Sequence, residues 1–345
     1  MITARENVGG FAALADERAR ILEYLAQQMQ ATLGGAAGFL VETTDYVLSS
    51  PGKLLRPLLL LDACRAAGGD PEHVFPAAAG TEYGHVASLV HDDIIDGDTE
   101  RRGQESLQSK YDVPMALLTG DLLIFQTFLS YTRCQERGVS AERVLDAIRA
   151  LSSTCIDMCR GQALESEIAG DLDTTEETYL ELVRLKTASF CQAASYIGAC
   201  LAEAPENVVT CLAEYGRNLG MAFQIMDDIL SYDGSALLMG KPLTSDLRNR
   251  RVTLPIIYAL ELGRLPARRR IQAYFDATGD VTNEKYAQLV RLLGATRAID
   301  RARARLPLYH AGEAAARLPR LLRGARPLER AGGCLPHARS LGLDD

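Results

Sequence analysis

Two pairs of adjacent aspartates each follow a long apolar helical stretch, and they are the residues best suited to chemistry. In the first pair, Asp92-Asp93, the acid Asp96 lies one helical turn beyond Asp92, and His85 and Ser88 share the same helix face. Two carboxylates one turn apart can reach one hard cation, and Mg²⁺ combines few carboxylates with waters and phosphate oxygens. The alternative is a set of exposed acids at a helix C-terminus, where the helix dipole opposes negative charge.

The second pair, Asp227-Asp228, repeats this arrangement at the end of another apolar stretch. Gln224 lies on the same helix face as Asp227, and Phe223 precedes it. Two such helices on opposite sides of a bundle would surround the mouth of an apolar shaft with carboxylates, and bundle cores often hold metal sites. We therefore expect both pairs to face one pocket and to bind metal together.

Basic residues must accompany these acids if the ligand is a phosphate, because carboxylates alone repel anions. The candidates near the ends of the predicted helices are Lys53, Arg56, Arg101, Arg102, Lys186 with Thr187, Lys241 and Arg251. Singly, each is typical of a solvated surface charge. Together they would suit two phosphate-rich ligands, one bridged by metal to the acids and one held directly by Arg and Lys.

The composition is that of a globular protein, with 47% hydrophobic and 24% charged residues in 345. The net charge of −8 argues against a nucleic acid as partner. No apolar run approaches the roughly eighteen residues of a membrane span, and the N-terminus lacks a secretory signal, so we expect a cytoplasmic protein. The eight cysteines form no C-x-x-C pair, which favours reduced core residues over a zinc or disulfide set.

Helices must position all these residues, because strand signals are nearly missing and apolar residues recur at three and four. The predicted helices run from Pro51-Gly52 to about 67 and over about 76–96, 114–138, 140–169, 176–202 and 205–231, with another beginning near Leu254. The fold class is all-α. We expect a single domain over residues 1–345, with the motifs in about 49–262 and a helical but poorly defined segment at 265–345.

The ordered motifs resemble those of the trans-isoprenyl diphosphate synthases, or polyprenyl synthetases. The resemblance runs from Gly52 to about Pro255, and its motifs are Gly52-Lys53-Leu54-Leu55-Arg56-Pro57, His85, Asp92-Asp93-Ile94-Ile95-Asp96, Arg101-Arg102-Gly103, Gly120-Asp121, Lys186-Thr187, Phe223-Gln224-Ile225-Met226-Asp227-Asp228, Gly240-Lys241, Asp246 and Thr253-Leu254-Pro255. It implies an isoprenoid-synthase-type helical bundle with a central apolar shaft. It also implies head-to-tail condensation of isopentenyl diphosphate with an allylic diphosphate, in a homodimeric enzyme.

The same resemblance implies a role for each candidate. Asp92, Asp96 and Asp227 would bind Mg²⁺ directly, Asp93 and Asp228 would act less directly, and three ions would clamp the allylic diphosphate. The residues that would contact this diphosphate are Arg101, Lys186, Thr187, Gln224 and Lys241, with Phe223 and Arg251 in the same substrate site. Lys53, Arg56, His85 and Arg102 would hold isopentenyl diphosphate. The implied mechanism is ionisation of the allylic C–O bond, attack by the isopentenyl double bond and loss of a proton.

This sequence departs from the family pattern at three places. Ser231 stands where the second motif usually has a third Asp, which predicts a weaker second metal site. Arg250-Arg251 replaces a Gly-Lys pair. Ala87 and Ser88 are small where bulky residues block the growing chain in the family, which favours products of C20 or longer.

Phe125 and Phe128 are candidates for a deeper floor of the shaft, although ordinary core packing would also explain both aromatics.

Two other functions stay open at this point. A class I terpene cyclase shares the helical fold and an aspartate-rich motif but needs no isopentenyl site, so the basic residues and Asp227-Asp228 argue against it. A non-catalytic subunit of a heteromeric synthase is the other alternative. Ser231 and Arg250 are the features that hint at it, and the complete first motif speaks against it.

Overall fold

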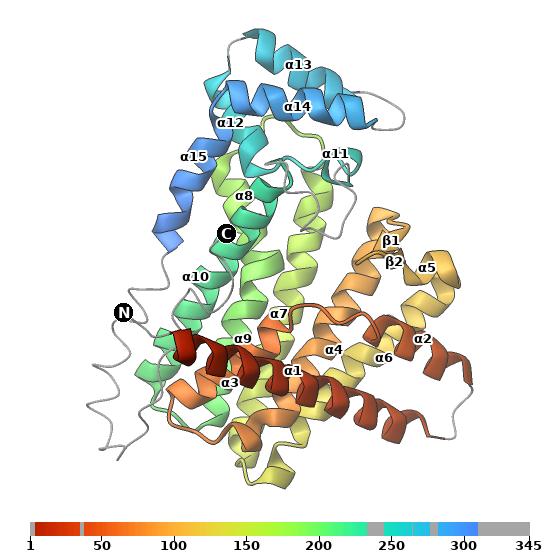
Figure 1. Ribbon diagram of the computed structural model, residues 1–345, viewed down its shortest axis with the longest axis vertical. Coiled ribbons are helices and arrows are strands. Elements are labelled where there is room, and N and C mark those ends of the chain that lie inside the picture. The colour runs from red at the N-terminus through yellow and green to blue at the C-terminus, as the bar shows by residue number, and fades with distance from the viewer. Residues whose placement is uncertain (1–3, 35–37, 233–244, 264, 277–281, 310–345) are drawn as a thin grey trace.

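The computed structural model describes residues 4–34, 38–232, 245–263, 265–276 and 282–309 (Figure 1). Within these ranges the only strands form a two-stranded hairpin, and all other regular structure is helical, so the predicted all-α class is confirmed. The lower part of the molecule in Figure 1 contains α1 (Ala4–Leu33), α2 (Gly38–Leu48), α3 (Leu55–Ala66), α4 (Pro71–Asp96), β1 (Glu100–Arg101), β2 (Gln104–Glu105), α5 (Leu107–Lys110), α6 (Val113–Thr132) and η1 (Gln135–Arg137).

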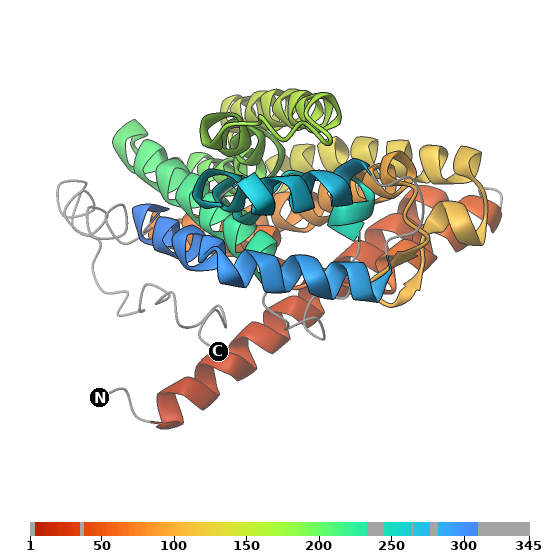
Figure 2. The same ribbon diagram turned by 90° about the horizontal axis from the view of Figure 1, so that it is seen from above.

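Long helices connect this part to an upper layer. They are α7 (Ala141–Glu167), α8 (Glu176–Val183) with η2 (Arg184–Ala188) and α9 (Ser189–Leu201), and α10 (Glu206–Leu230). The upper layer consists of α11 (Ser245–Arg248), α12 (Leu254–Leu262), α13 (Leu265–Asp276), α14 (Asn283–Ala295), α15 (Ala298–Arg305) and η4 (Leu306–Tyr309). From above, α13 and α14 lie across the ends of the long helices, whereas α1 extends away from the bundle (Figure 2).

Two large apolar clusters hold these parts together. The first joins α1, α3, α4, α6, α7 and α9, with Leu60, Tyr83 and Ile197 fully buried. The second joins α10, α12, α13, α14 and α15, with Ile225, Ile256 and Leu289 at its centre. Burial of this kind stabilises a fold by about 25 cal/mol per Å² of apolar surface. The functional cavity lies between the two clusters.

Helix α4, which carries the first aspartate motif, begins earlier than the sequence predicted. It starts at Pro71, and the side chain of Asp70 caps it by accepting a hydrogen bond from the Glu72 amide at 2.9 Å. Pro76 lies inside the helix, so it leaves the carbonyl of Glu72 without its intrahelical donor. Arg137 Nη1 donates to that carbonyl at 2.9 Å, which explains how the proline is tolerated.

The predicted helix over 176–202 is present but contains a π-helical turn, η2, at Arg184–Ala188. Such turns widen a helix locally and are frequent at functional sites. Gly161 on α7 allows the close approach, because a Cβ there would lie within 3 Å of the Lys186 backbone. The π turn therefore sets the direction of the Lys186 and Thr187 side chains, although both residues lie in the middle of a helical stretch.

The hairpin of β1 and β2 was missed by the sequence analysis because each strand has only two residues. Its two-residue loop, Arg102-Gly103, has positive φ angles of 52° and 76°. Turns that require positive φ at both central positions match the twist of paired strands, and glycine fills one position without strain. The hairpin fixes Arg101 and Arg102 next to the end of α4.

Helix α6 has an unusual surface. By length and composition alone, Val113–Arg137 could cross a membrane, but core helices of globular bundles meet the same criteria. Its inner face packs on α4 and buries Ala116 and Leu123. Its outer face exposes large apolar side chains, which are Val113, Leu117, Leu118, Phe125 and Leu129.

Candidate active site

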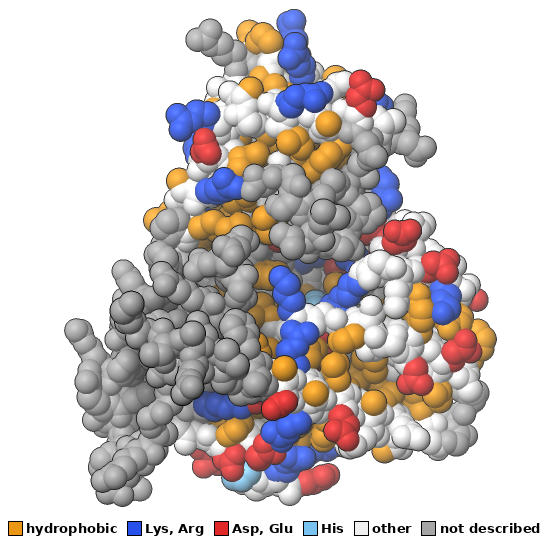
Figure 3. All heavy atoms as spheres, in the orientation of Figure 1, with side chains coloured by type: hydrophobic (Ala, Val, Ile, Leu, Met, Phe, Trp, Pro, Cys, Tyr) orange, Lys and Arg blue, Asp and Glu red, His pale blue; other side chains and the backbone are white. Residues whose placement is uncertain are grey.

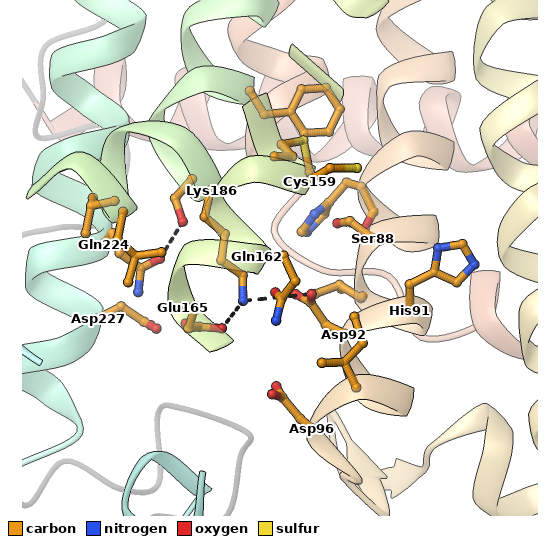
Figure 4. Close-up of a pocket in the computed structure, with 18 of the residues that line it drawn as sticks. Ser88, His91, Asp92, Asp96, Cys159, Gln162, Glu165, Lys186, Gln224 and Asp227 are labelled. Atoms are coloured by element: carbon orange, nitrogen blue, oxygen red, sulfur yellow. Dashed lines mark hydrogen bonds and ion pairs between the residues drawn. The ribbon is translucent and has the colours of Figure 1, made fainter. Parts of the chain in front are cut away.

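One cavity of about 620 Å³ separates the two apolar clusters, and both aspartate motifs line it. Asp92 and Asp96 come from α4 on one wall, whereas Asp227 and Asp228 come from α10 on the other. In Figure 4 Asp227 and the α4 acids lie on opposite sides of Lys186 and Glu165. Figure 3 shows Lys and Arg side chains around a hollow between the lower and upper parts of the molecule. The two motifs thus share one site, as the sequence predicted.

On the α4 wall, each of the two acids that line the cavity faces a cation. Lys186 Nζ lies 3.8 Å from Asp92 Oδ1, and Arg251 Nη2 lies 2.6 Å from Asp96 Oδ2. Burial raises the pKa of Asp92, and the ammonium of Lys186 opposes that shift. Asp93 points away from the cavity, because it is buried and accepts a hydrogen bond from Arg101 Nε at 2.7 Å. Its contact with Arg101 fixes the hairpin against α4.

Glu165 on α7 joins the two cations, although the sequence analysis did not single it out. Its Oε2 lies 2.5 Å from Lys186 Nζ, and its Oε1 lies 3.4 Å from Arg251 Nε. Burial alone would raise the pKa of Glu165, but Arg251 and Lys186 together hold it below the ordinary value. Arg251 also pairs with Asp246 at 3.2 Å. Glu165 therefore orients both cations toward the cavity.

On the α10 wall, neutral groups surround the buried acid Asp228. The Tyr179 hydroxyl donates to its Oδ2 at 2.6 Å, and the Gln224 amide donates to its Oδ1 at 2.8 Å. Burial, together with the nearby carboxylate of Asp246, raises the pKa of Asp228 to about 8. Thr187 Oγ1 donates to the Gln224 carbonyl oxygen at 2.9 Å, so the network fixes the amide orientation.

Ser231 lines the same wall one turn beyond Asp227. Its hydroxyl donates to the Asp227 carbonyl at 3.3 Å, within its own helix. No carboxylate extends from this position. The α10 wall therefore offers fewer charged oxygens than the family pattern does.

Lys186 and Arg251 form the first basic group of the cavity. A second basic group lines the cavity beside the α4 wall and consists of Arg56, His85, Arg101 and Arg102. Arg102 Nη1 donates to the Ser50 carbonyl at 2.7 Å, and the Arg56 guanidinium lies 5.4 Å from the centroid of the Phe190 ring. Burial holds the pKa of His85 well below its ordinary value, and the positive charges of Arg56 and Arg102 lower it further. The imidazole is therefore neutral at pH 7.

The structure does not bring every candidate to the cavity. The Lys53 side chain is exposed and outside the lining, although Arg18 from α1 binds the Gly52 and Lys53 carbonyls at 3.0 and 2.8 Å. Lys241 lies outside the described residues. The candidates that do line the cavity are Arg56, His85, Asp92, Asp96, Arg101, Arg102, Lys186, Thr187, Phe223, Gln224, Asp227, Asp228 and Arg251.

The apolar end of the cavity passes between α4, α6, α7 and α9. Ser88 and Phe128 line it, together with Leu151 and Phe190. Ala87 is fully buried outside the lining, so only Ser88 of the two small residues faces the shaft. Phe125 is 70% exposed on the outer face of α6, which makes its proposed roles as floor or core residue wrong.

Arg250 occupies the position where the family pattern has glycine. Its φ of 54° lies in the left-handed region, which costs a non-glycine residue about 1 kcal/mol. Its carbonyl accepts a hydrogen bond from the Gly170 amide at 2.8 Å, which ties the Arg250-Arg251 segment to the end of α7. Arg251 therefore lines the cavity even though the residue before it is not glycine.

The donor set fits a hard divalent cation, because the candidate ligands on both walls are carboxylate oxygens. Among the described residues, no three His, Cys, Asp or Glu side chains converge closely enough to hold one ion by themselves. Mg²⁺ commonly binds through one or two carboxylates and completes its shell with substrate phosphates and waters. The separated walls match this mode of binding.

An all-α bundle whose cavity combines carboxylates on two walls with Lys and Arg side chains is suited to bind a phosphate-bearing ligand together with divalent cations. A family profile described as polyprenyl synthetase matches residues 38–293. The chain therefore belongs to the polyprenyl synthetase family and is a prenyltransferase.

Individual relatives agree with this assignment. The chain is 38% identical over 230 residues to a geranylgeranyl diphosphate synthase of Sulfolobus acidocaldarius, covering 67% of this chain and 69% of that one. The solved geranylgeranyl pyrophosphate synthetase of Pyrococcus horikoshii superposes with a TM-score of 0.78 at 26% identity, over 98% of this chain and 96% of that one. A polyprenyl synthase of Caulobacter crescentus, solved with calcium and isoprenyl diphosphate, gives 0.75 at 26% identity, over 91% and 90%.

Proposed function

We propose that this protein condenses isopentenyl diphosphate head to tail with an allylic diphosphate and releases a trans-prenyl diphosphate of C20 or longer. The observation that carries the proposal is the shared cavity, in which an acidic mouth, two basic groups and an apolar shaft adjoin one another. A terpene cyclase would need no second basic group, so Arg56 and Arg102 favour elongation. The complete set of acids on α4 disfavours a non-catalytic subunit.

Asp92, Asp96 and Asp227 are the proposed Mg²⁺ ligands. The family resemblance implies three ions. When bound, Mg²⁺ supplies positive charge to the diphosphate leaving group. Asp93 and Asp228 support this site indirectly, because Arg101 holds the first and Tyr179 and Gln224 hold the second.

The allylic diphosphate is proposed to lie between the walls, next to Lys186 and Arg251. Both cations already point into the cavity and are oriented by Glu165. As the allylic C–O bond breaks, negative charge grows on the diphosphate oxygens, and fixed positive charge there stabilises the transition state. The hydroxyl of Thr187 and the amide of Gln224 contribute oriented dipoles on the same side.

Isopentenyl diphosphate is proposed to bind beside Arg56, His85 and Arg102. The neutral imidazole of His85 can donate one N–H to a phosphate oxygen, and the two guanidinium groups supply paired donors. The double bond then faces the allylic carbon across the cavity, where apolar side chains keep water from the cation. The released proton is proposed to leave with the diphosphate.

Product length is proposed to depend on Ser88, which lines the shaft without blocking it. Replacing it with a bulky side chain, Ser88→Phe, is expected to shift the products to shorter chains. Ala87→Phe would disturb the core instead, because Ala87 is fully buried outside the lining. Unchanged products from a folded Ser88→Phe variant would show that the chain grows elsewhere.

We also propose that the protein is a homodimer and that the outer face of α6 forms its interface. Leu118 and Phe125 are 55% and 70% exposed on this face, and three further large apolar side chains accompany them. A contiguous exposed apolar surface marks an association site more often than free surface. Leu118→Glu should convert a dimer to a monomer in light scattering, whereas a wild-type monomer would contradict the interface.

The experiment that tests the function uses purified protein with Mg²⁺, isopentenyl diphosphate and geranyl, farnesyl or geranylgeranyl diphosphate. Pyrophosphate release and chromatography of the dephosphorylated products report the reaction and the chain length. Longer prenyl alcohols are expected only when both substrates are present. A cyclic hydrocarbon from the allylic substrate alone, or no pyrophosphate at all, would contradict the proposal.

A further inference from the structure

A buried carboxylate lies directly behind the proposed isopentenyl diphosphate site. Glu82 on α4 is 2% exposed and precedes His85 by almost one helical turn. It is not part of the cavity lining, whereas Arg56, His85 and Arg102 are. Neither of its carboxylate oxygens has a hydrogen-bond partner within the described part of the chain. A buried polar group of this kind requires an explanation, because desolvation without a partner costs free energy.

The positive charges of three arginines from three different elements act on Glu82. The arginines are Arg56 from α3, Arg102 from the turn between β1 and β2, and Arg18 from α1. The other titratable groups of this cluster are Arg101, Asp93 and the neutral His85. Burial raises the pKa of Glu82 to about 7, and the three arginines act in the opposite direction. Glu82 is thus the negative charge behind an otherwise basic group.

Without this charge the arginines would repel one another. Burial lowers the pKa of Arg102, and the charges of Arg101 and Arg56 lower it further, whereas the carboxylates of Glu82 and, more weakly, Asp93 oppose the shift. Other contacts fix the backbone around them, because Arg102 binds the Ser50 carbonyl and Arg18 binds the Gly52 and Lys53 carbonyls. These contacts tie the Arg102 guanidinium to the segment that precedes α3, but they place no negative charge beside Arg56 and Arg102. The Glu82 carboxylate supplies that charge, because it interacts electrostatically with both.

We propose that Glu82 is a positioning residue for isopentenyl diphosphate, holding Arg56 and Arg102 at the spacing that one diphosphate requires. It acts from the protein side of the two guanidinium groups, while the diphosphate binds from the cavity side. Residues that orient ligand-binding groups from behind commonly change affinity about 10- to 100-fold when altered, as measured at metal sites. The inference rests on the proposed placement of isopentenyl diphosphate.

The test compares Glu82→Gln, which keeps the shape and removes the charge, with the wild-type protein in steady-state kinetics. The KM for isopentenyl diphosphate is expected to rise at least about tenfold, while the KM for the allylic diphosphate and kcat at saturation stay within about twofold. Glu82→Asp restores a carboxylate and should recover part of the loss. Glu72→Gln is the matched control, because Glu72 is on the same helix and pairs with Arg20 far from the lining.

An unchanged or lower KM for isopentenyl diphosphate in Glu82→Gln overturns the inference, since the carboxylate would then only repel the substrate. Equal rises in both KM values would show a general structural effect and also overturn it. Arg56→Gln separates this failure from that of the site itself. If Arg56→Gln raises the KM and Glu82→Gln does not, only the positioning role fails. If neither does, the proposed isopentenyl site fails with it.

Discussion

The two aspartate walls of the cavity have related motifs but different surroundings. On α4, Asp92 and Asp96 face the cations Lys186 and Arg251, and Glu165 holds those cations in place. On α10, Asp228 is buried among neutral donors and its pKa is raised to about 8. The α4 acids are therefore balanced by the protein's own cations.

This difference gives each wall a separate task. The α4 wall places acids and bases side by side, so it can bind both a metal and a phosphate oxygen. The α10 wall combines Asp227 with the buried Asp228 and its hydrogen-bonded amide network, and Ser231 stands where a third carboxylate would be. The first wall is the stronger site by this account, and each prediction below tests that ranking.

The largest effect is expected from Asp92→Asn. Loss of a charged oxygen that acts on the leaving group should lower kcat by about 10²–10³-fold, a magnitude typical of lost transition-state stabilisation. Steady-state pyrophosphate release measures the change. Asp300→Asn is a suitable control, because Asp300 is 60% exposed on α15 and outside the lining. Near-normal turnover in Asp92→Asn would reverse the ranking of the walls.

A smaller effect is expected from Glu165→Gln. This change keeps the side chain's shape but releases Lys186 and Arg251, so the KM for the allylic diphosphate should rise about 10- to 100-fold. The KM for isopentenyl diphosphate should change much less, since the ion pairs of Glu165 are with Lys186 and Arg251 and not with Arg56 or Arg102. Equal changes in both constants would show that Glu165 supports the whole bundle and not the two cations.

The mildest change in activity is expected from Ser231→Asp. An added carboxylate one turn beyond Asp227 supplies the acid that the second motif lacks, so the Mg²⁺ concentration for half-maximal activity should fall a few-fold. Ser231→Asn adds a similar volume without charge and is the matched control. A higher Mg²⁺ requirement in Ser231→Asp would mean that the buried acids on α10 cannot accept another negative charge.

The stability of the protein should depend on pH through Glu82. Its pKa is near 4.5 when unfolded and about 7 when folded, so the folded state binds more protons between these values. The stabilisation that this group contributes is complete below about pH 4.5 and is lost as pH rises through 7. The difference of about 2.5 pKa units corresponds to at most about 3 kcal/mol.

Glu82→Gln should remove this dependence. The melting temperature of the variant relative to wild type should therefore increase from pH 5 to pH 8. If the difference stayed constant over that range, Glu82 would not titrate there. The two predictions for Glu82 together describe a Glu82→Gln variant that gains stability relative to wild type as the pH rises and has a higher KM for isopentenyl diphosphate.

The sequence predicted the two motif-bearing helices well because each is long and strongly periodic. It also predicted that the acids of α4 and α10 share a cavity, since local spacing determines which side chains lie on one face. The start of α4 was predicted wrongly because Pro76 looked like a helix start, and its tolerance depends on Arg137, which is 61 residues away.

Other features of the site depend on contacts that local patterns do not encode. The π turn at Lys186 requires the close approach of Gly161, and the hairpin that carries Arg102 is too short to give a strand signal. Gln162 and Glu165 also line the cavity and were missed. Gln162 and Glu165 are three residues apart and therefore share one face of the helix, which was the signal in the sequence. It was not used, because an isolated Gln and Glu on a helix usually face solvent.

The central claim is that the two acidic walls hold one allylic diphosphate jointly through divalent cations. Calorimetric binding of an unreactive thio analogue of the allylic diphosphate tests it directly, with and without Mg²⁺, in wild type, Asp92→Asn, Asp227→Asn and the double variant. The account predicts that each single change removes most of the Mg²⁺-dependent affinity, and that the double change costs little more than Asp92→Asn. Additive losses, or tight binding without Mg²⁺, would contradict it.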